Sequence, residues 1–88
     1  MRIEKDVEIL NEYGIHARPA SLFVKVASRY AADIMVVKDG SEVPGKSIMG
    51  LMTLQASVGS KLRLVADGED ADEMIDALVT LIESKFEE

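Results

Sequence analysis

Four segments of the chain have the hydrophobic patterns of β-strands. Apolar and polar residues alternate along RIEKDVEI, residues 2–9, except that Lys5 interrupts the apolar row. A half-buried strand has this two-residue period because successive side chains point to opposite faces of a sheet. Three shorter apolar or β-branched runs follow, DIMVVK at 33–38, SEV at 41–43 and KLRLVA at 61–66. We therefore expect four strands.

Apolar residues at helical spacing predict a first helix from Ala17 to about Tyr30. They are Leu22, Phe23, Val26, Ala27 and Tyr30. Pro19 lies near the helix start, where its missing N–H costs no helical hydrogen bond. His16 is therefore expected at the N-cap or next to it.

Two more helices are predicted from their caps and their apolar spacing. Ser47 is a good N-cap for a short helix to about Leu54. The spacing directs three of its side chains inward, Ile48, Leu51 and Met52. The last helix follows Asp70, and Glu73 three residues later is typical of a capping box. Its apolar residues recur at steps of four, three and four, at Ala71, Ile75, Leu78 and Ile82.

The resulting order, βαββαβα, predicts an α+β fold. Asp39-Gly40 is a strong signal for a two-residue hairpin turn, so strands 33–38 and 41–43 are expected to be antiparallel. Pro44 is expected to end that pairing. Three amphipathic helices must bury their apolar stripes on the single apolar face of a four-stranded sheet. We expect a two-layer open-faced β-sandwich, and these arguments leave the remaining strand order open.

Charge and composition narrow the possible partners and location. The formal net charge is −6, which argues against general nucleic-acid binding. Residues 13–32 nevertheless carry Arg18, Lys25 and Arg29 and no acid. Chance scatter and a docking face for an anionic group or acidic partner both explain this local positive charge.

The residue types also exclude several classes of site and location. The chain has no cysteine and one histidine, so it has no disulfide and a structural zinc site is not expected. No apolar run approaches the ~20 residues of a membrane span, and the N-terminus is unlike a signal peptide. We expect one domain, residues 1–88, located in the cytoplasm without membrane insertion.

His16 lies where a helix start would make it a phosphate-ready nucleophile. The first backbone N–H groups, those of Ala17 and Arg18, and the helix dipole favour an anion there. The Arg18 guanidinium adds a planar charged group suited to phosphate oxygens. Phosphoryl transfer needs mainly positioning and charge stabilisation, so an imidazole that attacks phosphorus would need little else.

Simpler interpretations of His16 remain open at this point. A histidine at a helix start is often a plain cap or a surface residue. A metal site would lack a second imidazole. A catalytic triad would need an orienting carboxylate and a serine in reach, and Ser21 lies about a turn and a half along the helix.

Two stretches of the sequence resemble the signatures of a known family. GIHARPA, Gly14 to Ala20, is similar to the active-site signature of HPr, the histidine-containing phosphocarrier of the bacterial phosphotransferase system. KSIMGLMTL, Lys46 to Leu54, resembles the family's second signature, around a regulatory serine. GSKL at 59–62 and ADGEDA at 66–71 also fit, so the resemblance covers the whole chain in order.

The resemblance implies a fold and a chemistry. It implies four antiparallel strands with three helices, and a phosphoryl group that His16 accepts on Nδ1 from phosphorylated Enzyme I, itself charged by phosphoenolpyruvate. His16 would pass the group to the EIIA domain of a sugar permease or to a regulator, and Arg18 would assist. Ser47 matches the serine that an ATP-dependent HPr kinase/phosphorylase modifies in some bacteria. A serine N-cap alone would also explain Ser47.

The resemblance also implies a partner surface and no cofactor or metal. The surface is expected to comprise Ala20, Lys25, Lys46, Ile48, Met49 and Leu51. The chain is expected to be a monomer. An alternative role is a regulatory adaptor that binds a transcriptional regulator or an enzyme after phosphorylation. Pro44-Gly45 and Tyr13 depart from many members, so contacts near Lys46 and access to His16 are expected to differ.

Overall fold

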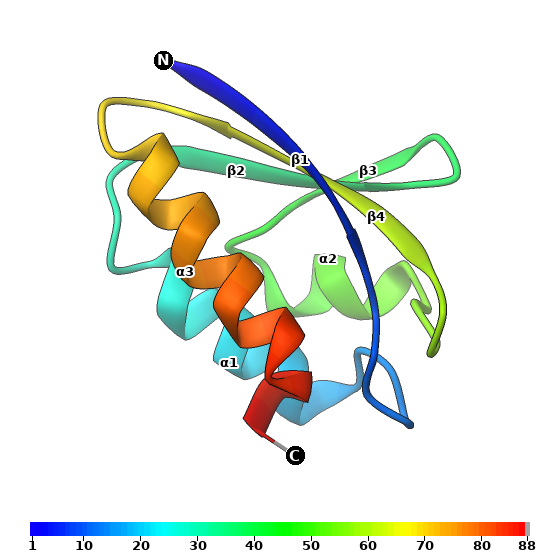
Figure 1. Cartoon of the computed structure of the whole chain (residues 1–88). Helices are drawn as coiled ribbons and strands as arrows, with labels where there is room; N and C mark the ends of the chain where they lie inside the picture. Colours follow the sequence, from blue (N-terminus) through cyan, green and yellow to red (C-terminus); the bar gives the residue numbers. More distant parts are fainter. Residues whose placement is uncertain (88) are drawn as a thin grey trace.

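The computed structural model describes residues 1–87 and has the expected order of elements (Figure 1). The strands are β1 (Arg2–Glu8), β2 (Asp33–Lys38), β3 (Ser41–Pro44) and β4 (Lys61–Asp67). The helices are α1 (Ala17–Ala27), α2 (Ile48–Thr53) and α3 (Ala71–Glu83), followed by a short 3-10 turn, η1 (Lys85–Glu87). Among these residues, none of the helices has the length and apolar character needed to span a bilayer.

The four strands form one antiparallel sheet in the order β1-β4-β2-β3. All three helices cover one face of this sheet, which confirms the α+β open-faced sandwich (Figure 1). The hairpin between β2 and β3 has the expected two-residue turn, since Lys38 pairs with Ser41 and both Asp39 and Gly40 have positive φ. Pro44 is the last paired residue of β3, one position beyond the predicted end.

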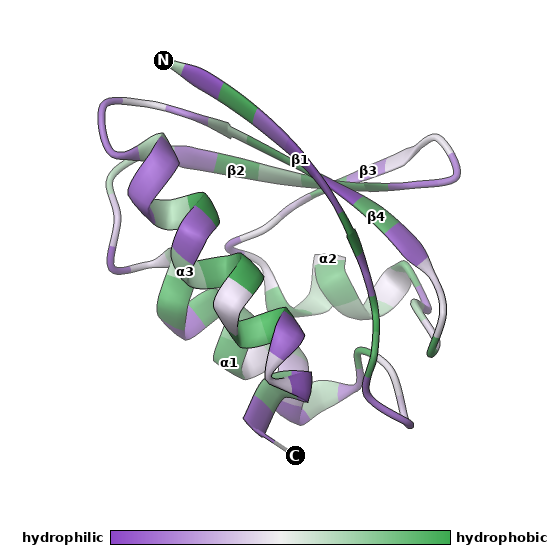
Figure 2. Ribbon diagram, in the orientation of Figure 1, coloured by the Kyte–Doolittle hydropathy of each residue, from purple (hydrophilic) through white to green (hydrophobic). Residues whose placement is uncertain are grey.

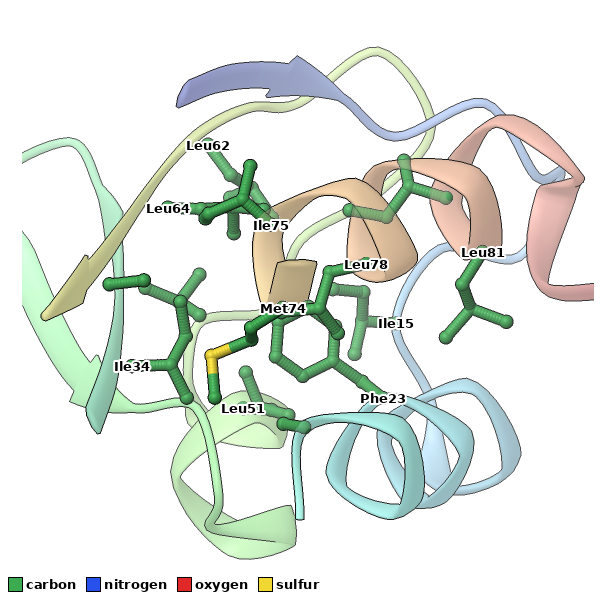
Figure 3. Close-up of a cluster of buried hydrophobic side chains, with 14 of the residues drawn as sticks. Ile15, Phe23, Ile34, Leu51, Leu62, Leu64, Met74, Ile75, Leu78 and Leu81 are labelled. Carbon is green, nitrogen blue, oxygen red and sulfur yellow. The ribbon is translucent and has the colours of Figure 1, made fainter. Parts of the chain in front are cut away.

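The core is one cluster of buried apolar residues contributed by the sheet and the helices. Figure 2 shows that apolar and polar positions are interspersed along these elements. Leu64 from β4 and Phe23, Leu51 and Leu78 from the three helices are fully buried. Figure 3 shows these side chains converging from elements far apart in the sequence. The predicted inner residues of α3 are buried, and Met74 and Leu81 join them. The apolar spacing therefore identified the packed face of this helix.

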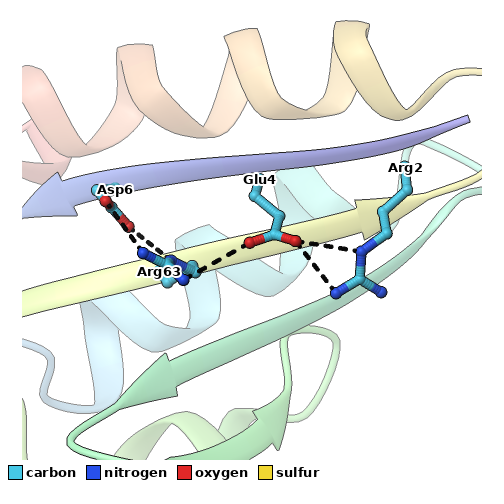
Figure 4. Close-up of polar contacts among 4 residues, drawn as sticks. All are labelled: Arg2, Glu4, Asp6 and Arg63. Carbon is cyan, nitrogen blue, oxygen red and sulfur yellow. Dashed lines mark hydrogen bonds and ion pairs between the residues drawn. The ribbon is translucent and has the colours of Figure 1, made fainter.

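The opposite face of the sheet is polar and carries a chain of ion pairs. Asp6 of β1 lies opposite Arg63 of β4, and Arg63 Nε donates to Asp6 Oδ1 at 2.9 Å. Glu4 lies between Arg63 and Arg2 and contacts both guanidinium groups (Figure 4). Because these side chains are exposed, the pairs add little stability to the fold.

The segment after α3 returns to the core, which the sequence pattern did not predict. Lys85, Phe86 and Glu87 have positive φ, so the chain turns sharply after α3. The turn buries the Phe86 side chain completely. The helical pattern that ends near Ile82 gave no indication of this contact, since one aromatic residue near a terminus has no period.

The predicted capping box at the start of α3 is wrong. Asp70 makes no side-chain bond to its own helix. Its two oxygens instead accept hydrogen bonds from the backbone N–H groups of Ala31 and Ala32, at 2.9 Å each. The tertiary contact satisfies two loop N–H groups and ties α3 to the segment between α1 and β2. The Asp70 carboxylate thus binds donors that are distant in the sequence and does not form the local capping box.

We expect Asp70→Asn to lower the thermal midpoint by a few degrees at neutral pH. The hydrogen bond from Ala31, followed by the bond from Ala32, lowers the pKa of Asp70 below its ordinary value of 3.8 despite partial desolvation. A lowered pKa in the folded state stabilises the protein above 3.8, and this contribution is lost as pH falls below that value. Thermal unfolding of both proteins from pH 7 to pH 2 should show the difference shrinking at acid pH. A difference that does not depend on pH would contradict this assignment.

Candidate functional site

The loop before His16 is fixed by a tight turn and by the neighbouring loop. The Gly14 N–H donates to the Asn11 carbonyl at 3.2 Å, and Asn11 Nδ2 donates to the Gly14 carbonyl at 2.7 Å. The Ile15 N–H donates to the Ala56 carbonyl at 2.8 Å. Gly14 has φ of +67°, and a Cβ there would overlap the Ala56 carbonyl oxygen. Glycine is therefore required both for the backbone conformation and for the close approach of the two loops.

His16 lies between two anchors in the core and is itself exposed. Ile15 on one side is 6% exposed and lies in the core (Figure 3). Pro19 and Ala20 on the other side are buried. His16 is the N-cap of α1, as predicted, and its carbonyl accepts the Ala20 N–H at 3.0 Å. The imidazole makes no side-chain capping bond to the helix. The imidazole therefore does not serve as a side-chain cap, and its exposure fits both a surface residue and a reacting group.

The first turn of α1 is electrostatically positive around the imidazole. The helical ladder does not use the N–H groups of Ala17 and Arg18, Pro19 has no N–H, and Ala20 donates to His16. The first turn contains no acidic residue, and Arg18 is exposed. The geometry therefore suits an anion beside His16. No three His, Asp or Glu side chains among residues 1–87 converge as ligands for a metal ion.

Ser47 is the N-cap of α2, as predicted. Its Oγ accepts the Gly50 N–H at 2.9 Å, and its carbonyl accepts the Leu51 N–H at 3.0 Å. The preceding residue, Lys46, donates from Nζ to the Tyr30 carbonyl at 2.9 Å. This contact joins the segment before α2 to the segment between α1 and β2, and Ser47 remains half-exposed.

Two residues of the expected partner surface are wrong. Ala20 and Leu51 are 0% exposed, because each lies on the inner face of its helix, so neither can contact a partner in this conformation. The exposed residues of that set are Lys25, Lys46, Ile48 and Met49. The inward direction expected of Ile48 and Met52 is also wrong.

The outer side of α2 instead presents an apolar patch that the sequence reasoning only partly identified. Met49 is 76% exposed, and Ile48 and Met52 are 39% exposed each. Residues 48 and 52 are four apart and share one side of the helix, whereas Leu51 and Leu54 share the buried side. We call Ile48, Met49 and Met52 the α2 patch.

Comparison with known proteins places the chain among relatives of this architecture. Residues 3–84 match the family described as PTS HPr component phosphorylation site. The chain belongs to the HPr family. It is 46% identical to the phosphocarrier protein HPr of Treponema pallidum, covering 98% of each chain. It is 45% identical to the HPr-like protein Crh of Halalkalibacterium halodurans, over 94% of this chain and 99% of that protein.

Solved structures of the HPr family agree with the fold. The crystal structure of HPr-C-His from Thermoanaerobacter tengcongensis has a TM-score of 0.94 at 52% identity, covering 98% of this chain and 97% of that chain. An HPr dimer from the same organism has a TM-score of 0.79 at 54% identity, covering 93% and 94%. The chain is accordingly a phosphocarrier of the phosphotransferase system, and its fold is the HPr open-faced sandwich.

Proposed function

We propose that His16 is the residue that carries the phosphoryl group. The observation that supports this most directly is its position, an exposed imidazole at the N-cap of α1 that the helix does not use for capping. The residue also falls within the matched family region, in the signature GIHARPA. A phosphoryl group on Nδ1, the nitrogen used in the family, would be stabilised by Arg18 and by the N–H groups of Ala17 and Arg18.

The transfer needs no bound cofactor in this proposal. The imidazole nitrogen attacks phosphorus, and the bond between phosphorus and Enzyme I breaks, with its electron pair leaving on Enzyme I. A nucleophilic group of the EIIA domain then attacks the same phosphorus, and the bond between phosphorus and the imidazole breaks with its electron pair returning to the ring nitrogen of His16. His16 is a covalent carrier in both steps, and the chain acts as a substrate of its partners rather than as a catalyst that turns over alone.

The exposed charges and the α2 patch support a docking surface for these partners. Lys25 and Lys46 are exposed, the α2 patch is apolar, and the segment from 13 to 32 has no acid. An acidic surface with an apolar centre would complement this arrangement. We place Enzyme I, EIIA and, where present, HPr kinase/phosphorylase on this surface. The proposal includes a cytoplasmic, monomeric protein formed by one domain, although a related HPr is a dimer.

Incubation with Enzyme I and phosphoenolpyruvate tests the carrier. The expected product is one phosphate per chain that is labile to acid and stable to base, as a phosphohistidine is. Subsequent addition of an EIIA domain should remove it. Failure to form this adduct would contradict the proposal.

A regulatory adaptor is the second candidate, and two features of this chain favour it. The HPr-like protein Crh of Halalkalibacterium halodurans is 45% identical, and Ser47 is accessible at a helix start. A phosphate there would be tolerated by the N-terminus of α2 and would add about −1.5 to −2 charge to the docking surface. That charge would repel an acidic partner and attract a basic one. A chain that served only as an adaptor would more naturally lack the histidine, so we keep the carrier as the main function.

Ser47→Ala is expected to have two separate effects. Loss of the bond from Gly50 to Oγ should destabilise the protein by about 1 kcal/mol, the usual cost of removing an N-cap. The variant should also form no acid-stable phosphate with HPr kinase/phosphorylase and ATP. Denaturant unfolding and acid-treated gels measure the two effects. Ser21→Ala, an exposed serine within α1, is the matched control, and an acid-stable phosphate that persists in Ser47→Ala would contradict the assignment.

A further inference from the structure

The strand β1 is an edge of the sheet that is long enough to pair with another strand. The strand order places β1 and β3 at the two edges. The β3 edge is four residues long and ends at Pro44, so it offers little to another strand. The β1 edge is seven residues long and contains neither proline nor glycine. It is therefore the edge through which a further strand would add to this sheet.

Lys5 occupies a position of β1 where the pattern calls for an apolar residue. It lies opposite Leu64, which is fully buried, on the side of the sheet that faces the helices. The neighbouring positions on this side are Ile3 and Val7, both half-buried, whereas Lys5 is exposed. It lines a hollow of about 260 Å³ between β1 and α3 together with Ile82 and two acidic residues, Glu8 and Glu83. An ammonium group thus interrupts the apolar row at the margin of the core.

A second copy of this chain fits the β1 edge in one full-length register. Two antiparallel β1 strands paired along all seven residues place Ile3 opposite Val7 on the apolar side. Arg2 lies opposite Glu8 on the polar side, and both pairs are favourable. The two-fold axis of this arrangement passes through Lys5, so the two Lys5 side chains lie directly opposite each other. Like charges in that position oppose pairing.

On the outer, polar face of the sheet, the contacts between the two copies in this register are less unfavourable than the contact between the two Lys5 side chains. Glu4 and Asp6 would also lie opposite each other across the two copies, but both already contact Arg63 on the polar face. Among the described residues Lys5 makes no ion pair, although Glu8 and Glu83 line the same hollow, so a second Lys5 at the two-fold axis would face a positive charge that no carboxylate contacts. We propose that Lys5 prevents β1 of one copy from pairing with β1 of a second copy. This repulsion keeps two four-stranded sheets from joining through their β1 edges.

Lys5→Val tests the proposal by restoring the apolar row. Light scattering after size-exclusion chromatography should show the mass rising from monomer towards dimer as the protomer concentration increases. The starting protein should remain monomeric over the same range. Lys61→Val is the matched control, since Lys61 is 83% exposed on the outer face of β4, away from either edge. Lys5→Glu is a second control, because it again places two like charges opposite each other at the two-fold axis. Both Lys61→Val and Lys5→Glu should remain monomeric.

Amide hydrogen exchange identifies the surface that pairs. In a Lys5→Val dimer, the β1 amides that point away from β4 should exchange more slowly, while those of the α2 patch should be unchanged. Three outcomes would overturn the proposal. They are that Lys5→Val remains monomeric, that the unmodified protein already pairs through β1, or that Lys61→Val dimerises as strongly as Lys5→Val. Dimerisation of Lys5→Val without protection of β1 would also overturn it. If Lys5→Val does not fold, Lys5→Thr provides the same test with an uncharged β-branched residue.

Discussion

His16→Ala is expected to accept no phosphoryl group from Enzyme I and phosphoenolpyruvate. The chain contains one histidine, so no other imidazole can replace it. The fold should be retained, because the side chain is exposed and makes no capping bond to α1. The measurement is the acid-labile, base-stable phosphate, with circular dichroism to verify the fold. An acid-labile phosphate that persists in the variant would place the chemistry elsewhere.

Arg18→Ala is the informative companion to this experiment. It preserves the nucleophile and removes the charged group next to it, so phosphorylation should still occur on His16 but more slowly. Removing one donor that stabilises transition-state charge typically costs about 10²–10³ in rate. Arg18→Lys should recover only part of the loss, because a lysine keeps the charge without the planar guanidinium. An unchanged rate in Arg18→Ala would remove this residue from the proposed site.

Gly14→Ala is expected to destabilise the protein by about 2–4 kcal/mol, a large share of the stability of a small domain. The positive φ alone costs an alanine roughly 1–2 kcal/mol. The remainder arises because the new Cβ would overlap the Ala56 carbonyl and lie 2.8 Å from Ser57 Cα, so the two loops must separate. Since the Ile15–Ala56 hydrogen bond positions the start of α1, transfer through His16 should slow as well.

Gly59→Ala separates the two causes. Gly59 also has a positive φ, of +86°, but a Cβ there meets nothing within 4 Å. The Gly59→Ala variant should therefore be destabilised by the positive φ alone, without the further destabilisation that the overlap causes in Gly14→Ala. Urea unfolding of both variants measures the difference, and phosphorylation of His16 should be affected only by Gly14→Ala. Equal losses of stability would show that the contact between the loops is unimportant.

The parts of the site that could be predicted from the sequence are those that local interactions determine. Pro19 and the apolar spacing placed the start of α1, and with it His16 and Arg18, correctly. Ser47 caps α2 as its residue type predicts, because its hydroxyl needs only an N–H three residues away. Asp39-Gly40 forms the expected turn because both residues tolerate positive φ, which is also a local property.

Predictions failed where a distant segment supplies the partner. Asp70 is a plausible local cap, yet it accepts hydrogen bonds from a loop almost forty residues earlier in the chain. Ala20 and Leu51 lie within the family's signatures, but the packing of α1 and α2 on the core buries both. Phe86 is buried by a turn that no periodic pattern announces.

By itself, the sequence determined the order of strands and helices, the position of His16 at the start of α1 and the family. These follow from periodicity, caps and residue types, which act over a few residues. Only the tertiary structure decided the strand order, the faces that α2 buries and exposes, and the support of the His16 loop by Ala56. It also decided that Lys5 lies at a sheet edge. These features depend on which distant segments meet when apolar area is buried, and no local pattern encodes that choice.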